Sequence, residues 1–220
     1  MTHEGTDFLY PFIEAGEHDS TSLLSDLATS ADAKDADSVR LRNSTLSSCS
    51  SQLEEAAVEM ARRFEGGGRL FSAGNGGSST DAASLAFLFS HPPSGRPLPA
   101  RSLVADEAIL TALGNDVGFD LVFSRQVIAY ATAPDILIGF STSGNSANLV
   151  RAFEQAKRGD LLTIGLAGYE GGQMAECGHV DHLFVVRSDS VHRIQETQDA
   201  LGVALWRAVQ GRLGAMAGAR

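Results

Sequence analysis

The fold is decided by residues 136–148, which read ILIGFSTSGNSAN. The first five residues, Ile136 to Phe140, form a short apolar run that suits a buried strand of a parallel sheet. Apolar residues then recur at helical spacing, at Leu149, Val150, Phe153 and Ala156. The polar residues between these two patterns therefore lie where a strand ends and a new helix begins.

This polar segment is typical of a loop that binds phosphate. It carries the hydroxyl side chains of Ser141, Thr142, Ser143 and Ser146. The free backbone N–H groups at the start of a helix, helped by the helix dipole, attract an anion, and each hydroxyl can donate one more hydrogen bond. A Walker-type loop would carry a Lys after its second glycine, and no Lys follows here. The loop therefore favours a sugar phosphate over a nucleoside triphosphate.

The pattern from Arg69 onward predicts an α/β fold, because short apolar runs alternate with helical segments as in a doubly wound parallel sheet. The five predicted strands are residues 70–73, 102–105, 136–140, 161–166 and 183–186. The predicted helices are residues 81–89, 107–113, 121–131, 149–157 and a long final one from about 194 to 209. Ligands of such sheets bind beyond the carboxyl ends of the strands, where the order of the strands reverses.

The 220 residues are enough for one domain with a full core. Residues 1–20 are expected to be flexible, residues 21–68 to form N-terminal helices, residues 69–212 to form the ligand-binding domain, and residues 213–220 to be a flexible C-terminus. Within the N-terminal part, Ser51 to Glu54 fits a capping box that would begin the second helix, and Gly66 to Gly68 would end it.

Composition limits the partners of this chain. The formal net charge of −10 argues against nucleic acid or an anionic membrane as the main partner, because both reward clustered Lys and Arg. Cys49 and Cys177 are too few for a disulfide framework, and no apolar stretch approaches the length of a membrane span. The N-terminus lacks a basic start followed by an apolar run. We therefore expect a cytoplasmic protein, and its negative charge does not exclude a small anionic ligand, because local amides and hydroxyls set the potential inside a pocket.

A second glycine-rich segment, residues 74–78 (GNGGS), follows the first predicted strand. Gly74 and Gly76 fit the first two positions of a dinucleotide fingerprint, but Ser79 occupies the third and no acid that would bind a ribose is found. A dinucleotide site and a purely structural turn are the alternatives to a phosphosugar loop. The segment 177–182 (CGHVDH) carries potential metal ligands, but neighbouring residues of a strand point to opposite faces. We expect neither a metal nor a cofactor.

Several motifs occur together in one order along residues 69–200. They are GNGGS at 74–78, GND at 114–116, GF at 118–119, FSR at 123–125, STSGNSAN at 141–148, GG at 171–172 and RIQE at 193–196. By these motifs the chain resembles the SIS (sugar isomerase) domain family and, within it, the phosphoheptose isomerases. The resemblance implies a flavodoxin-like sheet of five parallel strands and a homotetramer with active sites at subunit boundaries.

The resemblance also implies a substrate and the residues that bind it. The phosphate would be held by Ser141, Thr142, Ser143 and Ser146. The sugar would lie against Asn75, Gly76, Gly77, Ser78, Asp116 and Gln195. The implied reaction converts sedoheptulose 7-phosphate to an aldoheptose 7-phosphate by proton transfer between adjacent carbons. Such a reaction needs a base next to the carbonyl and a group that moves a proton between oxygens.

The acid and base of the family have no counterpart at the matching positions. Leu88 stands where the family has a Glu, Val203 where it has a His, and Ser84 where a second His accompanies the Glu. Some family members bind zinc through these side chains, which the residues of this chain cannot replace. His192, beside Arg193, is a candidate for a relocated acid or base, and a surface or helix-capping His is the alternative.

Three functions remain open at this point. The first is an isomerase with altered acid and base residues. The second is a non-catalytic phosphosugar sensor or a tetrameric adaptor that docks a protein partner. The third is an SIS protein that serves a different lyase or isomerase reaction.

Overall fold

The computed structural model describes residues 20–218, in two compact units that divide at Arg40. The first unit contains, within the described residues, the larger part of helix α1 (Ser20–Ser48). Helix α1 includes the acidic segment Asp32 to Asp37. The second unit, Leu41–Arg220, contains the sheet and all of the predicted site residues. The predicted flexible residues 1–19 lie outside the described part of the chain.

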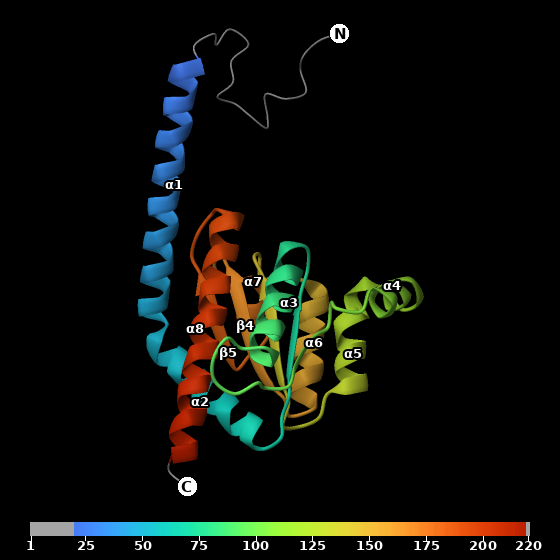
Figure 1. The fold of residues 1–220 in the computed structure, drawn as a ribbon. Helices are drawn as coiled ribbons and strands as arrows, with labels where there is room; N and C mark the ends of the chain where they lie inside the picture. The colour runs from blue at the N-terminus through green and yellow to red at the C-terminus, as the bar shows by residue number, and fades with distance from the viewer. Residues whose placement is uncertain (1–19, 219–220) are drawn as a thin grey trace. The chain divides into compact units, whose positions relative to one another are not determined.

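The second unit is built on one sheet of five parallel strands (Figure 1). The strands are β1 (Leu70–Gly74), β2 (Ala100–Ser102), β3 (Ile136–Ser141), β4 (Leu162–Gly168) and β5 (His182–Val186). Their order is β2-β1-β3-β4-β5, which confirms the predicted doubly wound α/β fold. The order reverses between β1 and β3, and Gly74 pairs with Phe140 there. The two predicted ligand loops therefore leave neighbouring strands side by side.

Helices cover both faces of this sheet (Figure 1). On one face, α2 (Ser50–Glu65), α3 (Gly77–Ser90) and α8 (Val191–Gly218) share a core with the strands. On the other face, α5 (Val122–Tyr130), α6 (Ala147–Arg158) and the short α7 (Gly172–Glu176) form a second core. Helix α4 (Glu107–Asp116) and a 3₁₀ turn (Phe119–Leu121) connect β2 to α5. Among residues 20–218, no helix combines the length and the apolar character that crossing a membrane requires.

Several predictions about the ends of elements are wrong, and α3, for example, begins at Gly77 rather than at residue 81. Strand β2 ends at Ser102, because the chain turns there toward Asp106, whose side chain caps α4 by accepting a hydrogen bond from Ile109 N at 3.0 Å. Helix α2 begins at Ser50, and the hydroxyl of Ser51 donates to Glu55 rather than forming a capping box. Helix α8 runs to Gly218, beyond the end predicted for this helix at about residue 209. Leu213, which lies in this continuation of the helix, is buried in the core.

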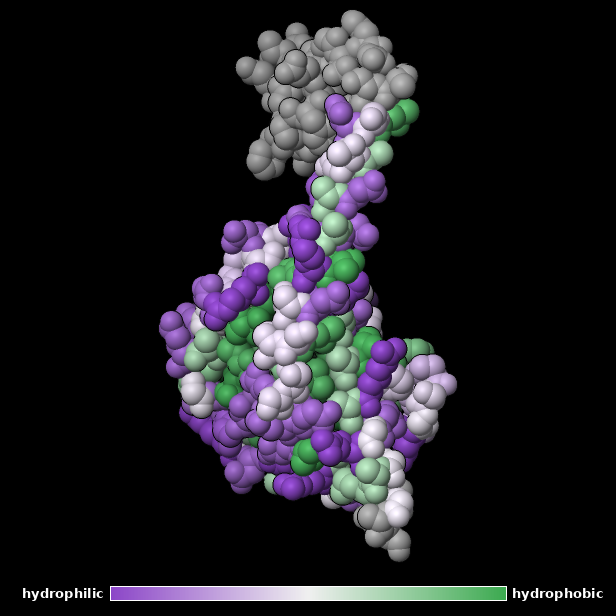
Figure 2. Space-filling view, turned by 90° about the vertical axis from the view of Figure 1, so that its left-hand side faces the viewer, coloured by the Kyte–Doolittle hydropathy of each residue, from purple (hydrophilic) through white to green (hydrophobic). Residues whose placement is uncertain are grey.

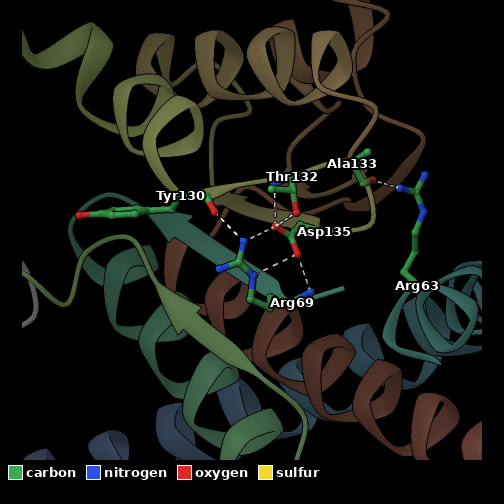
Figure 3. A network of polar contacts seen from close by, with 6 residues as sticks. All are labelled: Arg63, Arg69, Tyr130, Thr132, Ala133 and Asp135. Carbon is green, nitrogen blue, oxygen red and sulfur yellow. Dashed lines mark hydrogen bonds and ion pairs between the residues drawn. The ribbon is translucent and has the colours of Figure 1, made fainter. Parts of the chain in front are cut away.

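A buried carboxylate joins the amino ends of β1 and β3 (Figure 3). Asp135 accepts hydrogen bonds from the backbone N–H of Arg69 at 2.7 Å, from its guanidinium at 2.8 Å and from the N–H of Thr132 at 2.8 Å. The same guanidinium donates to the carbonyl of Tyr130 at 2.6 Å. This network lies at the end of the sheet opposite the two ligand loops, so it fixes the strands without taking part in the site.

Candidate functional site

Two asparagines join the glycine loop to the phosphate loop. The amide of Asn75, after β1, donates to Asn148 Oδ1 at 2.9 Å, and the amide of Asn148 donates to Asn75 Oδ1 at 2.9 Å. Asn148 is buried in the first turn of α6, although a polar residue facing the core is costly unless it is paired. This reciprocal pair therefore fixes the distance between the two loops. The sequence predicts a role for Asn75 but assigns none to Asn148.

The hydroxyls of the phosphate loop hold the loop in a tight turn. Ser141 Oγ lies 2.9 Å from Ser146 Oγ and accepts a hydrogen bond from the N–H of Gly144 at 3.1 Å. Ser143 Oγ accepts a hydrogen bond from the N–H of Asn145 at 3.2 Å. Ser141 is buried, whereas Ser143 is exposed at the tip of the loop. The predicted phosphate ligands thus share one turn at the carboxyl end of β3.

Helix α6 begins in this turn and leaves its first amides free of a side-chain cap. Ser146 is the N-cap residue, but its hydroxyl makes no capping hydrogen bond and pairs with Ser141 instead. The first N–H groups of a helix have no carbonyl partner within the helix, and the helix dipole favours a negative charge there. An anion beside the loop would accept hydrogen bonds from these amides and from the hydroxyls.

The segment after β4 supports the phosphate loop from one side. Gly144 has a φ of 67°, and a Cβ at this position would lie 2.0 Å from the carbonyl oxygen of Gly171. The carbonyl of Gly144 accepts a hydrogen bond from Met174 N at 2.9 Å, and the side chain of Asn145 accepts one from Gln173 N at 2.9 Å. This close backbone approach admits glycine alone at position 144 without a shift. The loop is therefore formed in advance by the fold.

A pocket of about 400 Å³ opens beside the glycine loop. Its polar wall comes from Asn75, Gly76, Ser79 and Thr80, and its apolar wall includes Phe119 and Phe123. Gly76 has a φ of 54°, which turns the chain from β1 into α3. A pocket of mostly apolar lining with a few polar groups is typical of a small-molecule site.

The structure places the other predicted sugar ligands in different surroundings. Gln195, the fifth residue of α8, lies against the glycine loop, since a Cβ on Gly77 would come within 2.1 Å of its Nε2. Ser78 is buried at the start of α3. Asp116 is the exposed last residue of α4 and accepts a hydrogen bond from Asn115 at 2.8 Å, and it does not line the described pocket. His192 is exposed in the first turn of α8, three residues before Gln195.

The three positions at which the resemblance implies a Glu and two His residues line one cavity. Ser84 and Leu88 of α3 and Val203 of α8 line a space of about 220 Å³. Zinc requires nitrogen, sulfur or carboxylate ligands, and these three side chains offer a single hydroxyl. Among residues 20–218, no three His, Cys, Asp or Glu side chains are grouped so that they could hold a metal ion. The donor set therefore does not fit zinc.

Two carboxylates that sequence reasoning missed also line this cavity. They are Asp81 of α3 and Asp199 of α8. Burial, followed by the negative charge of Asp199, raises the pKa of the Asp81 carboxyl to about 6. A usable signal was present in the sequence, because Asp81 is followed by Ala82 and Leu85 on a helix that must pack against the sheet.

The sequence matches the family model for the SIS domain over residues 36–168. The phosphoheptose isomerase of Sulfurimonas denitrificans is 42% identical over 157 residues, which cover 69% of this chain and 77% of that protein. The phosphoheptose isomerase of Desulfovibrio desulfuricans is 41% identical over 172 residues, which cover 76% of this chain and 79% of that protein.

Solved structures give the same result for the fold. A phosphoheptose isomerase from Neisseria gonorrhoeae superposes with a TM-score of 0.78 at 35% sequence identity, covering 84% of this chain and 99% of that one. Similarity of sequence and similarity of fold thus point to one family.

Proposed function

Since this chain belongs to the SIS domain family, and within it resembles phosphoheptose isomerases, we propose that it binds a sugar phosphate and isomerises it between ketose and aldose. The observation that carries the proposal is the preformed loop after β3. Its hydroxyls and the uncapped amides of α6 offer several donors to one anion. Sedoheptulose 7-phosphate is the ligand that the resemblance implies.

The pocket beside the glycine loop offers polar groups to the part of the ligand next to the phosphate. Asn75 and Gly76 reach this pocket from the loop that lies beside the phosphate loop, and Ser79 and Thr80 add two hydroxyls. Amides and hydroxyls at one wall match the hydroxyls of a sugar chain. We assign Ser141, Thr142, Ser143 and Ser146 to the phosphate, and Asn75 to Ser78 and Gln195 to the sugar.

Thermal unfolding with and without sedoheptulose 7-phosphate tests the binding step, because a ligand that binds the native state raises the melting temperature. We expect the wild-type protein to be stabilised and the double variant Ser141→Ala with Ser143→Ala to lose that stabilisation. Ser51→Ala, on an exposed face of α2, serves as the matched control. Equal stabilisation of the double variant and the wild type would rule out the phosphate assignment.

A second function, a non-catalytic phosphosugar sensor or an adaptor for a protein partner, is favoured by one observation. Leu88 and Val203 occupy the cavity where the resemblance places a Glu and a His, and neither can carry a proton. Turnover of sedoheptulose 7-phosphate, measured as formation of the aldoheptose phosphate, separates the two functions. Stabilisation by the ligand without turnover would favour the sensor. Loss of turnover in His192→Ala would instead assign His192 to the chemistry.

We also propose that copies of this chain assemble as a tetramer. Apolar side chains, green in Figure 2, are exposed between purple regions on the side of the molecule that α2 and α8 help to form. A groove of about 870 Å³ lies there, with Leu53, Val203, Ala204 and Ala208 among its lining residues. An exposed apolar groove with a polar rim is typical of a surface that a partner covers.

A further inference from the structure

The cavity between α3 and α8 contains a carboxylate whose hydrogen-bonding capacity is unused. Asp81 Oδ2 is buried and has no hydrogen-bond partner among the described residues. Ser84 and Leu85 of its own helix and Asp199 of α8 line the same space, and Phe140 closes it from β3. The residues that line the cavity, all within the described chain, include no Lys, Arg or His. A buried polar atom without a partner is costly, so its retention points to a role outside folding.

The position of this cavity relates it to the proposed sugar site. Asp81 lies four residues after Gly77, and Asp199 lies four residues after Gln195. Gly77 and Gln195 touch across the interface of α3 and α8, so the two carboxylates occupy the next turn of the same two helix faces. Phe140, which closes the cavity, directly precedes Ser141 of the phosphate loop. A seven-carbon sugar that is held by its phosphate has its carbonyl carbons several bonds away from the loop.

We propose that Asp81 is the proton carrier of the isomerisation. Asp199, which lines the same cavity, acts on Asp81 through its negative charge. The proposal rests on the proposed function, and it replaces the Glu and His that the resemblance implies by a carboxyl group seven residues, or about two turns, before Leu88 on α3. Ser84, Leu88 and Val203 line the same cavity, and Leu88 and Val203 supply apolar side chains to it.

The chemistry of the step requires one group that both accepts and returns a proton. The Asp81 carboxylate takes the proton from the carbon next to the carbonyl, and the electron pair of that C–H bond forms the C=C bond of an enediolate while the carbonyl π pair moves onto oxygen. The carboxylic acid then returns the proton to the former carbonyl carbon. Within the enediolate, the hydroxyl proton on the oxygen of the deprotonated carbon moves to the former carbonyl oxygen, so the hydroxyl oxygen becomes the new carbonyl oxygen and no other reactant is consumed. A carboxyl group with a pKa of about 6 accepts and releases protons near neutral pH.

Asp199 lines both this cavity and the apolar groove on the neighbouring side of α8, as does Val203. If copies of the chain cover that groove, the cavity lies at a boundary between subunits and loses its access to solvent there. Exclusion of water keeps an unpaired carboxyl group poised for proton transfer.

The test compares Asp81→Asn, Asp199→Asn and the control Asp160→Asn in the full chain. Asp160 is exposed before β4 with a φ of 59°, a conformation that Asn adopts readily, and it lies at the end of the sheet away from the loops. We expect Asp81→Asn to lower turnover of sedoheptulose 7-phosphate by about 10²- to 10⁴-fold while its melting temperature still rises with the sugar phosphate. Asp160→Asn should match the wild type in both measurements.

The pH dependence of kcat tests the assignment further, because a purely structural role of Asp81 would leave this dependence unchanged. In the His192→Ala background, kcat should fall as the pH drops through about 6, the pKa of Asp81. Asp199→Asn removes the negative charge that helps to raise this pKa, so the fall in kcat should move to lower pH.

Wild-type turnover retained by Asp81→Asn, or binding without turnover in the wild type, would overturn the assignment of Asp81. Absence of stabilisation by the sugar phosphate in the wild type would instead overturn the proposed function itself.

Discussion

Asp135 shows how one buried charge holds the sheet together. Its side chain is almost fully buried at the start of β3, and its two oxygens accept five hydrogen bonds from Arg69 and Thr132. Burial alone would raise the pKa of this carboxyl, but the hydrogen bonds from Arg69 and Thr132 outweigh burial and lower it. Arg63 adds a hydrogen bond to the carbonyl of Ala133 in the same turn (Figure 3). The carboxylate is therefore a structural charge.

We predict that Asp135→Asn lowers the free energy of unfolding by about 2–3 kcal/mol, because it removes one partner of a buried ion pair. The sign of the pH dependence follows from the lowered pKa. The stabilisation is present above the pKa of the unfolded state and is lost as the pH falls through the pKa of the folded state. Urea unfolding at pH 7 and pH 3 measures both effects, and the difference between variant and wild type should shrink at pH 3. An equal difference at both pH values would contradict the role of the charge.

Asp81 differs from Asp135 because the fold raises the pKa of its carboxyl group instead of lowering it. Its raised pKa means that the folded state binds a proton more tightly than the unfolded state between about pH 4 and 6. Stability is therefore lost as the pH rises through this range. The Asp81→Asn variant should melt at a higher temperature than the wild type at pH 7. At pH 4 the two proteins should melt at the same temperature. A residue that weakens the fold at neutral pH is typical of functional sites. A lower melting temperature of the variant at pH 7 would show that the carboxylate stabilises the fold.

At the scale of elements, the loop after β3 depends on a close backbone approach to the segment after β4. We predict that Gly144→Ala lowers the melting temperature and abolishes stabilisation by sedoheptulose 7-phosphate. The added Cβ would meet the carbonyl oxygen of Gly171, and an alanine with a positive φ adds about 1–3 kcal/mol of strain. Each kcal/mol corresponds to about 2–4 °C in a chain of this size.

A glycine without such neighbours supplies the control for this experiment. Gly211 lies within α8, and a Cβ there would have nothing within 4 Å. Gly211→Ala should raise the melting temperature, because alanine is favoured in a helix interior by about 0.8–1.0 kcal/mol. Its ligand stabilisation should equal that of the wild type. If Gly144→Ala behaved like Gly211→Ala, the loop would not need the shape described here.

The elements that the sequence predicts well are those with a strong local pattern. The apolar run of β3 and the helical spacing of α6 identify the loop between them. The turn lies where the continuous apolar run ends and the helical spacing begins. Strand β2 begins two residues and ends three residues before its predicted bounds, since three residues carry too little pattern and the position of the strand is set by pairing with β1. The pairing of Asn75 with Asn148 depends on which strands are neighbours, so it follows from the topology and not from local sequence.

At the scale of the whole molecule, the groove along α2 and α8 leads to a prediction about assembly. We expect the protein to elute as a tetramer, with a mass about four times 23.1 kDa by light scattering. Ala204→Arg should shift the mass to smaller species, because it places a long charged side chain among Leu53, Val203 and Ala208 of the groove. The control is Ala108→Arg, on the exposed face of α4, which should leave the mass unchanged.

Assembly should also affect turnover. Because Val203 lines both the groove and the cavity of Asp81, the smaller species should lose turnover as well. A tetramer in Ala204→Arg would place the contacts between subunits elsewhere, and a monomeric wild type would contradict assembly altogether.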